Sequence, residues 1–374
     1  MDTQIKDLVE VSRFYGVNKE FVIAGGGNTS FKNNDYLWVK ASGVYLSNIN
    51  TDGFVCLARD KLKIIYNKKY STNSQSREAE VKNDLNSAMV SKNGKRPSVE
   101  SSLHDIIDYP FVVHTHPTLV NALLCSNNAR SLSAKLFGSD ILYIEYVDPG
   151  YVLFKKVSDE LVRYRKIRSC DPKVILIENH GIFVSGETIG EIKSIYSNIE
   201  NTILNEITGS LPANKCQPFD TSIRKRVVEF INSSQQCYTD TVSSDLISEF
   251  TRNERLFKDV DTAFTPDHIV YCKARYLFID DSNEEKALEE ITAFSKKNGY
   301  YSKIIAIKNK GLLIIEENES ALGVVRELIL NMMKISFYAR SFGGSKPLFD
   351  KNIAFIENWE AENYRKQMMN NSNK

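Results

Sequence analysis

The sequence predicts an α/β protein built from two domains. Short apolar runs typical of buried strands alternate with longer segments whose apolar residues recur at helical spacing, which is the pattern of mixed α/β chains. The length of 374 residues is long for one compact domain. A strand–turn–strand–helix pattern occupies residues 173–207, and a similar one begins at residue 303. We therefore expect domains at 1–220 and 221–374, the second being a degenerate copy of the first.

Composition excludes several classes of protein. Hydrophobic residues make up 42% and charged residues 25% of the chain, and the formal net charge is +1, as in ordinary globular proteins. These values indicate neither a nucleic-acid nor a membrane partner. No apolar run approaches the length of a membrane span, and the N-terminus lacks the blocks of a signal peptide. The six cysteines include no Cys-x-x-Cys pair, so we expect a reduced, cytoplasmic protein.

Elements of the first hundred residues follow from apolar spacing and turn signals. An amphipathic helix is predicted up to Gly16. The stretches "FVIAGGGNTSFK" and "YLWVKASG" predict a strand, a glycine-rich turn and a second strand that ends in a Ser-Gly turn. Residues 76–90 predict a helix. "PSVESSLHDII" predicts another helix, with Pro97 just before Ser98 as the N-cap.

The next hundred residues continue the alternation. "FVVHTHPTLV" at 111–120 predicts a buried strand, followed by a helix whose first turn holds Pro117. "DILYIEYV" predicts a strand closed by a turn at 148–150. Residues 173–207 predict two strands joined by a tight turn and then a helix. The stretch 208–220, which contains Gly, Pro and Asn, resembles a linker.

The second half contains an internal repeat. Residues 303–321, "KIIAIKNKGLLIIEENESA", align without a gap with residues 173–191, "KVILIENHGIFVSGETIGE". Any two units of this kind look alike to some degree, so the alignment is modest support. We favour a degenerate copy in which Lys310 stands where the first copy has His180, followed by a helix at 321–337.

Two histidines on one strand suggest a metal site. Residues i and i+2 of a strand project to the same face, so His114 and His116 lie side by side. One hydrogen-bonded core histidine and one strand-end histidine would explain the pair equally well, so a third ligand is needed. His180, at a strand end directly before Gly181, is the candidate. Three neutral imidazoles leave a fourth position open, as in catalytic zinc sites.

A carboxylate precedes the histidine strand. Glu100 opens the short helix before that strand, so the chain returns it close to the histidines. A carboxylate beside an open metal position can accept a proton. The alternative is a solvent-facing glutamate favoured by the helix dipole. His104 lies on the same helix face and can bond to Glu100, but we favour a hydrogen-bonded core histidine over a fourth ligand.

Glycine and hydroxyl residues suggest an anion site. In "GGGNTS", at 25–30, glycines let backbone N–H groups approach an anion, and Asn28, Thr29 and Ser30 add donors. The stretch has neither the Walker nor the dinucleotide-binding spacing, and a simple tight turn is the alternative. "ASG" at 41–43 and Ser98 are further positions suited to phosphate.

Taken in order, these segments resemble the class II aldolase/adducin family. The motifs are "GGGNTS", "VKASG", "PSVE", "HTHP" and "ENHG", spread over residues 5–210. "LWVKASG", "TPDHIVYCKARYLFI" and "NWEAENYR" are most similar to the rhamnulose-phosphate-aldolase-related branch, whose members often carry a dehydrogenase domain that we expect this chain to lack. The resemblance implies a three-layer α-β-α fold with a mainly antiparallel central sheet flanked by helices.

The resemblance also implies a role for each motif. The metal, zinc or another divalent ion, is expected on His114, His116 and His180, with Glu100 as the acid/base carboxylate. Substrate-binding positions, which hold a phosphate in the family, are expected at Asn28, Thr29, Ser42, Gly43 and Ser98. Val99 departs from the second serine that sugar-phosphate aldolases of the family often have there.

The function implied is that of a metal-dependent lyase. It would cleave a phosphorylated sugar or a related short ketose by retro-aldol chemistry, through a metal-stabilised enediolate. Epimerases, dehydratases and decarboxylases of the family use the same stabilisation, and adducin-like members are non-catalytic binding modules. The joint presence of three histidines and a glutamate favours an enzyme. Since family members form rings with sites between subunits, we expect a homo-oligomer.

Overall fold

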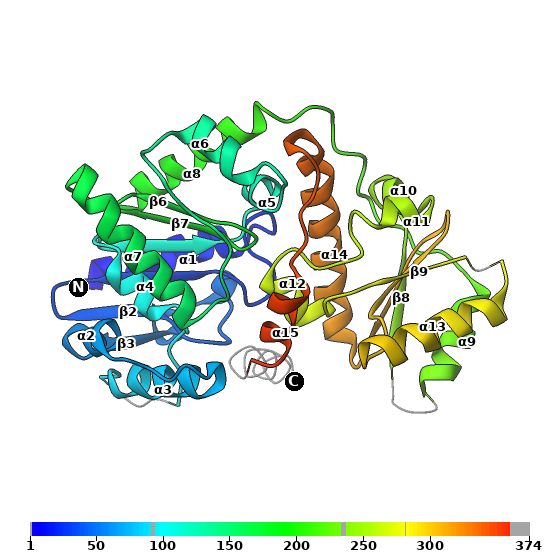
Figure 1. Ribbon diagram of the computed structural model, residues 1–374, viewed down its shortest axis with the longest axis horizontal. Coiled ribbons are helices and arrows are strands. Elements are labelled where there is room, and N and C mark those ends of the chain that lie inside the picture. Colours follow the sequence, from blue (N-terminus) through cyan, green and yellow to red (C-terminus); the bar gives the residue numbers. More distant parts are fainter. Residues whose placement is uncertain (1, 91–93, 233–236, 281, 360–374) are drawn as a thin grey trace. The chain divides into compact units, whose positions relative to one another are not determined.

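The computed structural model describes residues 2–90, 94–232, 237–280 and 282–359 (Figure 1). The chain divides into two compact units. The first contains the residues up to Leu124, then Asn128–Glu206 and a short piece that begins at Asn358. The second contains Cys125–Asn127 and Ile207–Glu357, so the stretch 208–220 opens the second unit. The predicted domain assignment at 1–220 and 221–374 stays a prediction.

A seven-stranded sheet forms the centre of the first unit, in the order β3-β2-β1-β4-β7-β6-β5. Neighbouring strands are antiparallel except for β5 and β6, which are parallel. The predicted mainly antiparallel central sheet is therefore confirmed. The strands are β1 (Asn28–Lys32), β2 (Tyr36–Lys40), β3 (Phe54–Ala58), β4 (Phe111–Thr115), β5 (Leu142–Ile144), β6 (Val174–Ile177) and β7 (Gly181–Gly186).

Helices cover both faces of this sheet, because alternate residues of each strand point to opposite faces. On one face, Thr29 of β1 and Thr115 of β4 bond to side chains of α1 (Asp2–Gly16) and α8 (Ile189–Leu204). The apolar core of the other face includes side chains from α2 (Arg59–Asn67), α3 (Ser74–Ser87), α4 (Ser101–Ile106) and α7 (Tyr151–Arg168). Figure 1 shows the sheet between its helices, which confirms the three-layer α-β-α prediction.

Shorter elements connect these layers. They are the 3-10 turns Leu46–Asn48 and Thr51–Gly53, α5 (Thr118–Leu124) and α6 (Ala129–Phe137). The first strand lies after the glycines of "GGGNTS", because residues 18–22 form a hydrogen-bonded turn instead. Three helices of the first unit were not predicted, α2, α6 and α7, and strand β3 was not predicted either. In α7 the buried residues Leu153, Phe154, Val157 and Leu161 do have helical spacing.

The second unit is built on a four-stranded sheet in the order β8-β11-β10-β9. The pairs β8–β11 and β11–β10 are antiparallel, and β10–β9 is parallel. Its strands are β8 (Tyr238–Val242), β9 (Leu277–Ile279), β10 (Ile304–Ile307) and β11 (Gly311–Glu316). Its helices are α9 (Ser222–Asn232), α10 (Asp245–Thr251), α11 (Glu254–Phe257), α12 (Pro266–Cys272), α13 (Glu284–Asn298), α14 (Glu319–Ala339) and α15 (Asp350–Glu357), with a 3-10 turn at Arg340–Phe342. The predicted helix at 321–337 lies within α14.

The two sheets share a common arrangement of strands. The order and directions β8-β11-β10-β9 match β4-β7-β6-β5 of the first unit. The shift in residue number is the same from β6 to β10, from β7 to β11 and from the start of α8 to the start of α14. A slightly smaller shift relates β4 to β8 and the start of α5 to the start of α10. The second unit therefore has the topology of one half of the first sheet.

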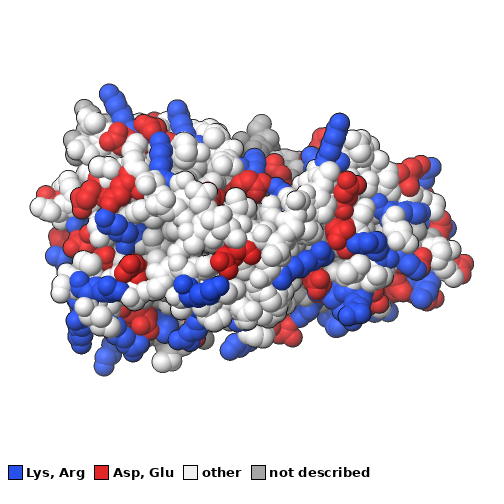
Figure 2. Space-filling view, turned by 90° about the horizontal axis from the view of Figure 1, so that it is seen from above, with Lys and Arg blue, Asp and Glu red and all other residues white. Residues whose placement is uncertain are grey.

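On the face shown in Figure 2, basic and acidic side chains are interspersed. Among the described residues, no helix combines the length and the apolar character that crossing a bilayer requires.

Candidate metal centre

His114 lies on β4 with its imidazole almost completely buried, at 1% exposure. Its Nδ1 is 2.9 Å from the carbonyl oxygen of Ile182 on the neighbouring strand β7. A carbonyl can only accept, so Nδ1 carries the proton and donates, which leaves the lone pair on Nε2. Burial also lowers the pKa of His114 well below its usual value. The ring is therefore neutral, with the tautomer that a metal ligand on Nε2 requires.

The other two histidines face the same point. The Nε2 atom of His116 lies 3.0 Å from Nε2 of His114. The ring centroids of the three histidines are 4.8, 5.1 and 5.3 Å apart, and one nitrogen from each lies within 4.8 Å of the others. The structure thus brings together His114, His116 and His180 from the end of β4 and from the turn between β6 and β7.

The turn that carries His180 has a specific backbone. Asn179 adopts a left-handed φ of 51°, which asparagine tolerates better than most residues. A Cβ atom at Gly181 would lie 2.5 Å from the carbonyl oxygen of Thr115 and 2.6 Å from Cδ2 of His116. Glycine is therefore needed there for the His116 ring to pack beside β7. Asn121 of α5 donates to the carbonyl oxygen of His180 at 3.2 Å and supports the turn from below.

Glu100 completes the group. Its Oε1 lies 3.4 Å from Nε2 of His114 and 3.5 Å from Nε2 of His180. It is the N-cap residue of α4, but its carboxylate is turned to the histidines instead of capping the helix. Burial raises the pKa of Glu100, and the facing imidazoles of His114 and His180 lower it when they carry a proton. The carboxylate thus lies beside three imidazoles.

This set of donors fits a divalent metal ion. Three imidazoles and a carboxylate that converge on one point are a common ligand set for zinc and related ions. The Nδ1 atom of His180 is buried and has no hydrogen-bond partner within the described part of the chain, so this ring is held through its backbone turn. The Phe183 ring stacks on His114 with centroids 4.1 Å apart and fixes its plane.

Asn28 and Thr29 point to opposite faces of the sheet. Asn28 pairs across the β1–β4 ladder with His114, so both side chains lie on the same face. Its amide is 1% exposed, and neither its oxygen nor its nitrogen has a partner among the residues described here. The Thr29 hydroxyl lies 2.7 Å from that of Ser12 in α1. Only the Asn28 side chain therefore faces the histidines.

The remaining predicted substrate residues lie in two adjacent segments. Ala41 forms an isolated bridge with Pro97, and the Ser42 N–H donates to the carbonyl oxygen of Arg96 at 2.9 Å. The bridge and this bond bring the Ser42-Gly43 turn next to the segment that leads to Ser98. In that turn Gly43 has a positive φ of 81°.

Ser98 is not the N-cap of α4, so that prediction was wrong. The helix begins at Ser101, later than expected. The Ser98 hydroxyl accepts the N–H of Glu100 at 3.2 Å, and its carbonyl accepts the N–H of Ser101 at 3.1 Å. The serine therefore closes a tight turn before the helix, a use of serine that competes with helix capping. This turn sets the start of α4 at the residue that follows Glu100.

His104 is a buried histidine of α4 outside the group of three. Its Nδ1 lies 2.7 Å from the Ser30 hydroxyl, and the side chain is 0% exposed. Burial lowers its pKa to about 3, so the ring is neutral. These contacts agree with the predicted core histidine. The supporting residues Asn121, Ile182 and Phe183 were not predicted, because an ordinary asparagine and two apolar strand residues carry no signal in sequence.

Several known proteins resemble this chain over part of its length. Residues 6–204 match the model of the class II aldolase and adducin N-terminal domain. An uncharacterized oxidoreductase, YuxG of Bacillus subtilis (strain 168), is 24% identical over 317 residues, which cover 78% of this chain and 44% of that protein. The chain therefore spans less than half the length of this relative.

Two shorter proteins match about half of this chain. The L-fuculose phosphate aldolase of Methanococcus vannielii is 24% identical over 206 residues, covering 54% of this chain and 92% of that enzyme. The structure of the N-terminal class II aldolase domain of a conserved protein from Thermoplasma acidophilum is 27% identical and covers 55% of this chain and 94% of that domain, with a TM-score of 0.46.

Proposed function

Because the chain belongs to the class II aldolase and adducin family, we propose that it is a metal-dependent lyase that cleaves a sugar phosphate or a related short ketose by retro-aldol chemistry. The observation that carries the proposal is the convergence of three imidazoles and the Glu100 carboxylate at one point. The unpartnered amide of Asn28 on the same face adds a group suited to a polar substrate. In the proposed reaction the histidines, Glu100 and Asn28 each have a separate role.

The three Nε2 atoms of His114, His116 and His180 would hold the divalent ion, and zinc suits imidazole donors. When bound, such an ion is a Lewis acid that stabilises negative charge developing on a substrate oxygen. The buried surroundings of His114 keep water away from that charge and so strengthen its stabilisation. No Schiff-base lysine is required by this chemistry.

Glu100 would move the proton. Its carboxylate accepts the proton of the substrate hydroxyl on the carbon that leaves as an aldehyde, and the adjacent carbon–carbon bond then breaks. The bonding electrons stay on the other carbon, which Glu100 protonates to complete the turnover. The Asn28 amide would hold a substrate oxygen. The remaining predicted positions would bind the phosphate, namely Thr29 through its backbone, Ser42, Gly43 and Ser98.

Other reactions remain as the second candidate. An epimerase, a dehydratase or a decarboxylase needs the same stabilised carbanion. The position of Glu100 beside the histidines would allow it to transfer a proton in each of these reactions. A non-catalytic adducin-like module would instead need no carboxylate among the imidazoles. The 3.4 Å and 3.5 Å distances from Glu100 to two histidines therefore favour an enzyme.

A screen of the metal-loaded protein tests the proposal. The protein would be incubated with zinc, cobalt or manganese and with short ketose phosphates and their unphosphorylated and acid analogues, and aldehyde products would be measured. Glu100→Gln should keep the metal and the fold but lower turnover roughly 10²–10⁴-fold. Glu78→Gln, the same change at another partly buried glutamate of the first unit, is the matched control and should leave turnover within about twofold. Full activity of Glu100→Gln would remove its role.

Three broader properties belong to the same proposal. A cytoplasmic location is proposed from the spacing of the six cysteines, which include no Cys-x-x-Cys pair. A homo-oligomer is proposed from the family resemblance alone. The second unit is proposed as a degenerate copy of the first, supported by its matching strand order and by the constant shift in residue number over its two central strands and the helix that follows them.

A further inference from the structure

The helix that carries Glu100 is very short. Helix α4 has six residues, Ser101–Ile106, and helices of this length are not stable on their own. The position of Glu100 at its N-cap is therefore set by whatever holds the helix. Any movement of α4 would change the distances from the carboxylate to His114 and His180.

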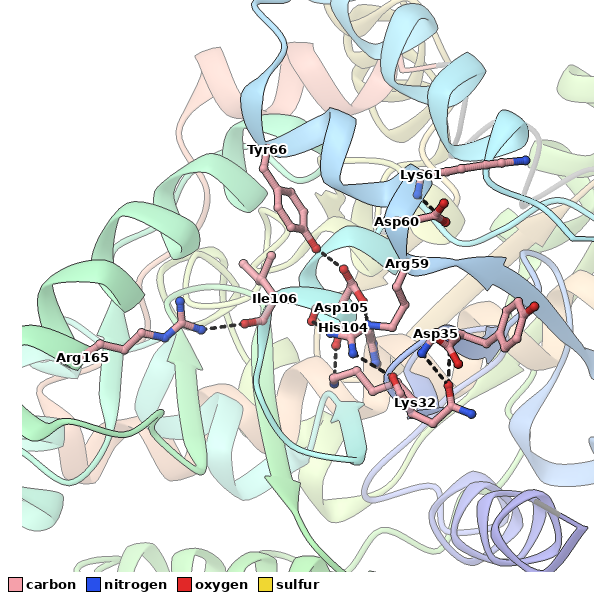
Figure 3. Close-up of polar contacts among 12 residues, drawn as sticks. Lys32, Asp35, Arg59, Asp60, Lys61, Tyr66, His104, Asp105, Ile106 and Arg165 are labelled. Carbon is pink, nitrogen blue, oxygen red and sulfur yellow. Dashed lines mark hydrogen bonds and ion pairs between the residues drawn. The ribbon is translucent and has the colours of Figure 1, made fainter.

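Three basic side chains donate hydrogen bonds to the last three carbonyl oxygens of α4 (Figure 3). Lys32 Nζ donates to His104 at 2.8 Å, Arg59 Nη2 to Asp105 at 3.4 Å, and Arg165 Nη2 to Ile106 at 2.9 Å. The carbonyls at a helix C-terminus have no partner within the helix, and cations are favoured there by the helix dipole. The donors come from β1, α2 and α7, so three elements meet at one end of α4.

Further contacts hold the two arginines in place. The Asp105 carboxylate accepts from Arg59 Nε at 2.5 Å and also from the Tyr66 hydroxyl. Arg165 binds the Asp171 carboxylate through two nitrogens, at 2.5 and 2.8 Å. Lys32 and Asp105 are 5% and 4% exposed. Burial lowers the pKa of Lys32 to about 7, and its amine is held by the His104 carbonyl, whereas Asp105 and Asp171 are paired with Arg59 and Arg165. The buried polar groups of the cluster are therefore satisfied by specific partners.

We propose that Lys32, Arg59 and Arg165 are positioning residues that hold α4 by its C-terminal carbonyls and so keep Glu100 against the histidines. They form the α4 clamp. The clamp is separate from the metal ligands, because His114, His116 and His180 lie on other elements than α4. Its loss should therefore misplace the carboxylate and leave the metal bound. This inference rests on the proposed function for its catalytic part only.

The test is Lys32→Met, which removes the amine donor and keeps most of the side-chain length. Hydrogen exchange of residues 101–106, followed by mass spectrometry on the full chain, should become at least about tenfold faster. Zinc content should stay at the wild-type level. Turnover should fall about 10–100-fold, since small misplacements of a reacting group have effects of this size. In the Glu100→Gln background, Lys32→Met should cause no further loss of turnover, because both changes act through one carboxylate.

A milder variant covers the case in which Lys32→Met does not fold. Tyr66→Phe removes the hydroxyl that donates to the Asp105 carboxylate. Hydrogen exchange of residues 101–106 should become about 2–10-fold faster in this variant, and turnover should fall by a similar factor. Unchanged exchange of α4 in a folded variant would overturn the clamp, whether or not a substrate is known. A further loss of turnover when Lys32→Met is added to Glu100→Gln would also overturn it. An absence of lyase activity in the wild type would count against the proposed function and leave the exchange result to decide the clamp.

Discussion

The turn at 178–180 and the turn at 308–310 have the same backbone in different surroundings. Asn179 and Asn309 both adopt a left-handed φ, of 51° and 58°. Each donates its N–H to the last residue of a helix, α5 in the first unit and α10 in the second. The first turn is buried from Glu178 to His180, whereas the second is exposed throughout. The same local backbone therefore supports a candidate metal ligand in one unit and a solvent-facing lysine in the other.

The difference extends to all three histidine positions. The strand register places Thr241 and Ser243 of the second unit where His114 and His116 stand in the first. The Thr241 hydroxyl donates to Phe219 at 2.6 Å, and the Ser243 hydroxyl donates to Gln217 at 3.2 Å. Both side chains thus satisfy backbone carbonyls. The strand–turn–strand frame is therefore separable from the chemistry carried on it.

The largest difference in stability should come from two equivalent lysines. Lys303 is 8% exposed and pairs with the buried Glu316, whereas Lys173 pairs with Glu191 on the surface. Lys303→Met leaves a buried carboxylate without its partner and should lower the free energy of unfolding by about 3–5 kcal/mol. Lys173→Met should lower it by about 0–1 kcal/mol. Urea denaturation of both variants measures the difference.

A double variant checks the cause. Lys303→Met combined with Glu316→Leu removes both charges and should recover most of the lost stability. If the double variant were as unstable as Lys303→Met alone, packing rather than an unpaired charge would explain the loss.

Alanine substitutions at the glycines that follow the two turns should affect stability and metal binding differently. A Cβ at Gly181 would meet the His116 ring, and a Cβ at Gly311 would lie 2.4 Å from the carbonyl oxygen of Val242. Gly181→Ala should therefore lower zinc affinity roughly 10–100-fold, measured by competition with a chelator. Gly311→Ala should destabilise the protein, because its φ of 153° is unfavourable for a side chain, and leave zinc affinity unchanged. Equal losses of zinc affinity in Gly181→Ala and Gly311→Ala would show that the two turns do not differ in metal binding.

A smaller effect, on how stability depends on pH, should distinguish α8 from α14, the helices that follow the two strand–turn–strand units. Glu200 of α8 stands where α14 has Leu330, by the alignment that pairs His180 with Lys310. Burial, with a contribution from the charge of Glu20, raises the pKa of Glu200 from 4.5 to about 7. The folded state thus retains a proton that the unfolded chain releases, so this group lowers stability as pH rises from about 4.5 to 7.

Glu200→Gln removes this titration. Between pH 5 and pH 8 the variant should lose less stability than the wild type, by at most about 1 kcal/mol because the side chain is only partly buried. Thermal denaturation at the two pH values measures it. Parallel pH profiles of the two proteins would assign the pH dependence to other groups.

Much of the candidate site could be predicted from sequence because strand geometry is local. The two-residue spacing places His114 and His116 on one face, and the same alternation separates Asn28 from Thr29, which the sequence prediction did not use. The predicted start of α4 was wrong because a serine, here Ser98, can close a turn as well as cap a helix.

Other features depend on contacts between distant parts of the chain. The α4 clamp joins Lys32, Arg59 and Arg165, whose meeting has no signal in sequence. The counterparts of the histidine strand were hidden because the shift in residue number from β4 to β8 is smaller than that from β6 to β10, so an ungapped alignment misses them. Only the strand register identifies Thr241 as the residue in the place of His114.

The most direct test of the difference between the units is a count of bound metal. Protein purified without chelator and equilibrated with zinc would be analysed for elemental content, with His180→Ala and Lys310→Ala as the matched pair. We expect about one ion per chain in the wild type and in Lys310→Ala, and almost none in His180→Ala. Two ions per chain, or unchanged content in His180→Ala, would contradict a single metal centre on the histidines of the first unit.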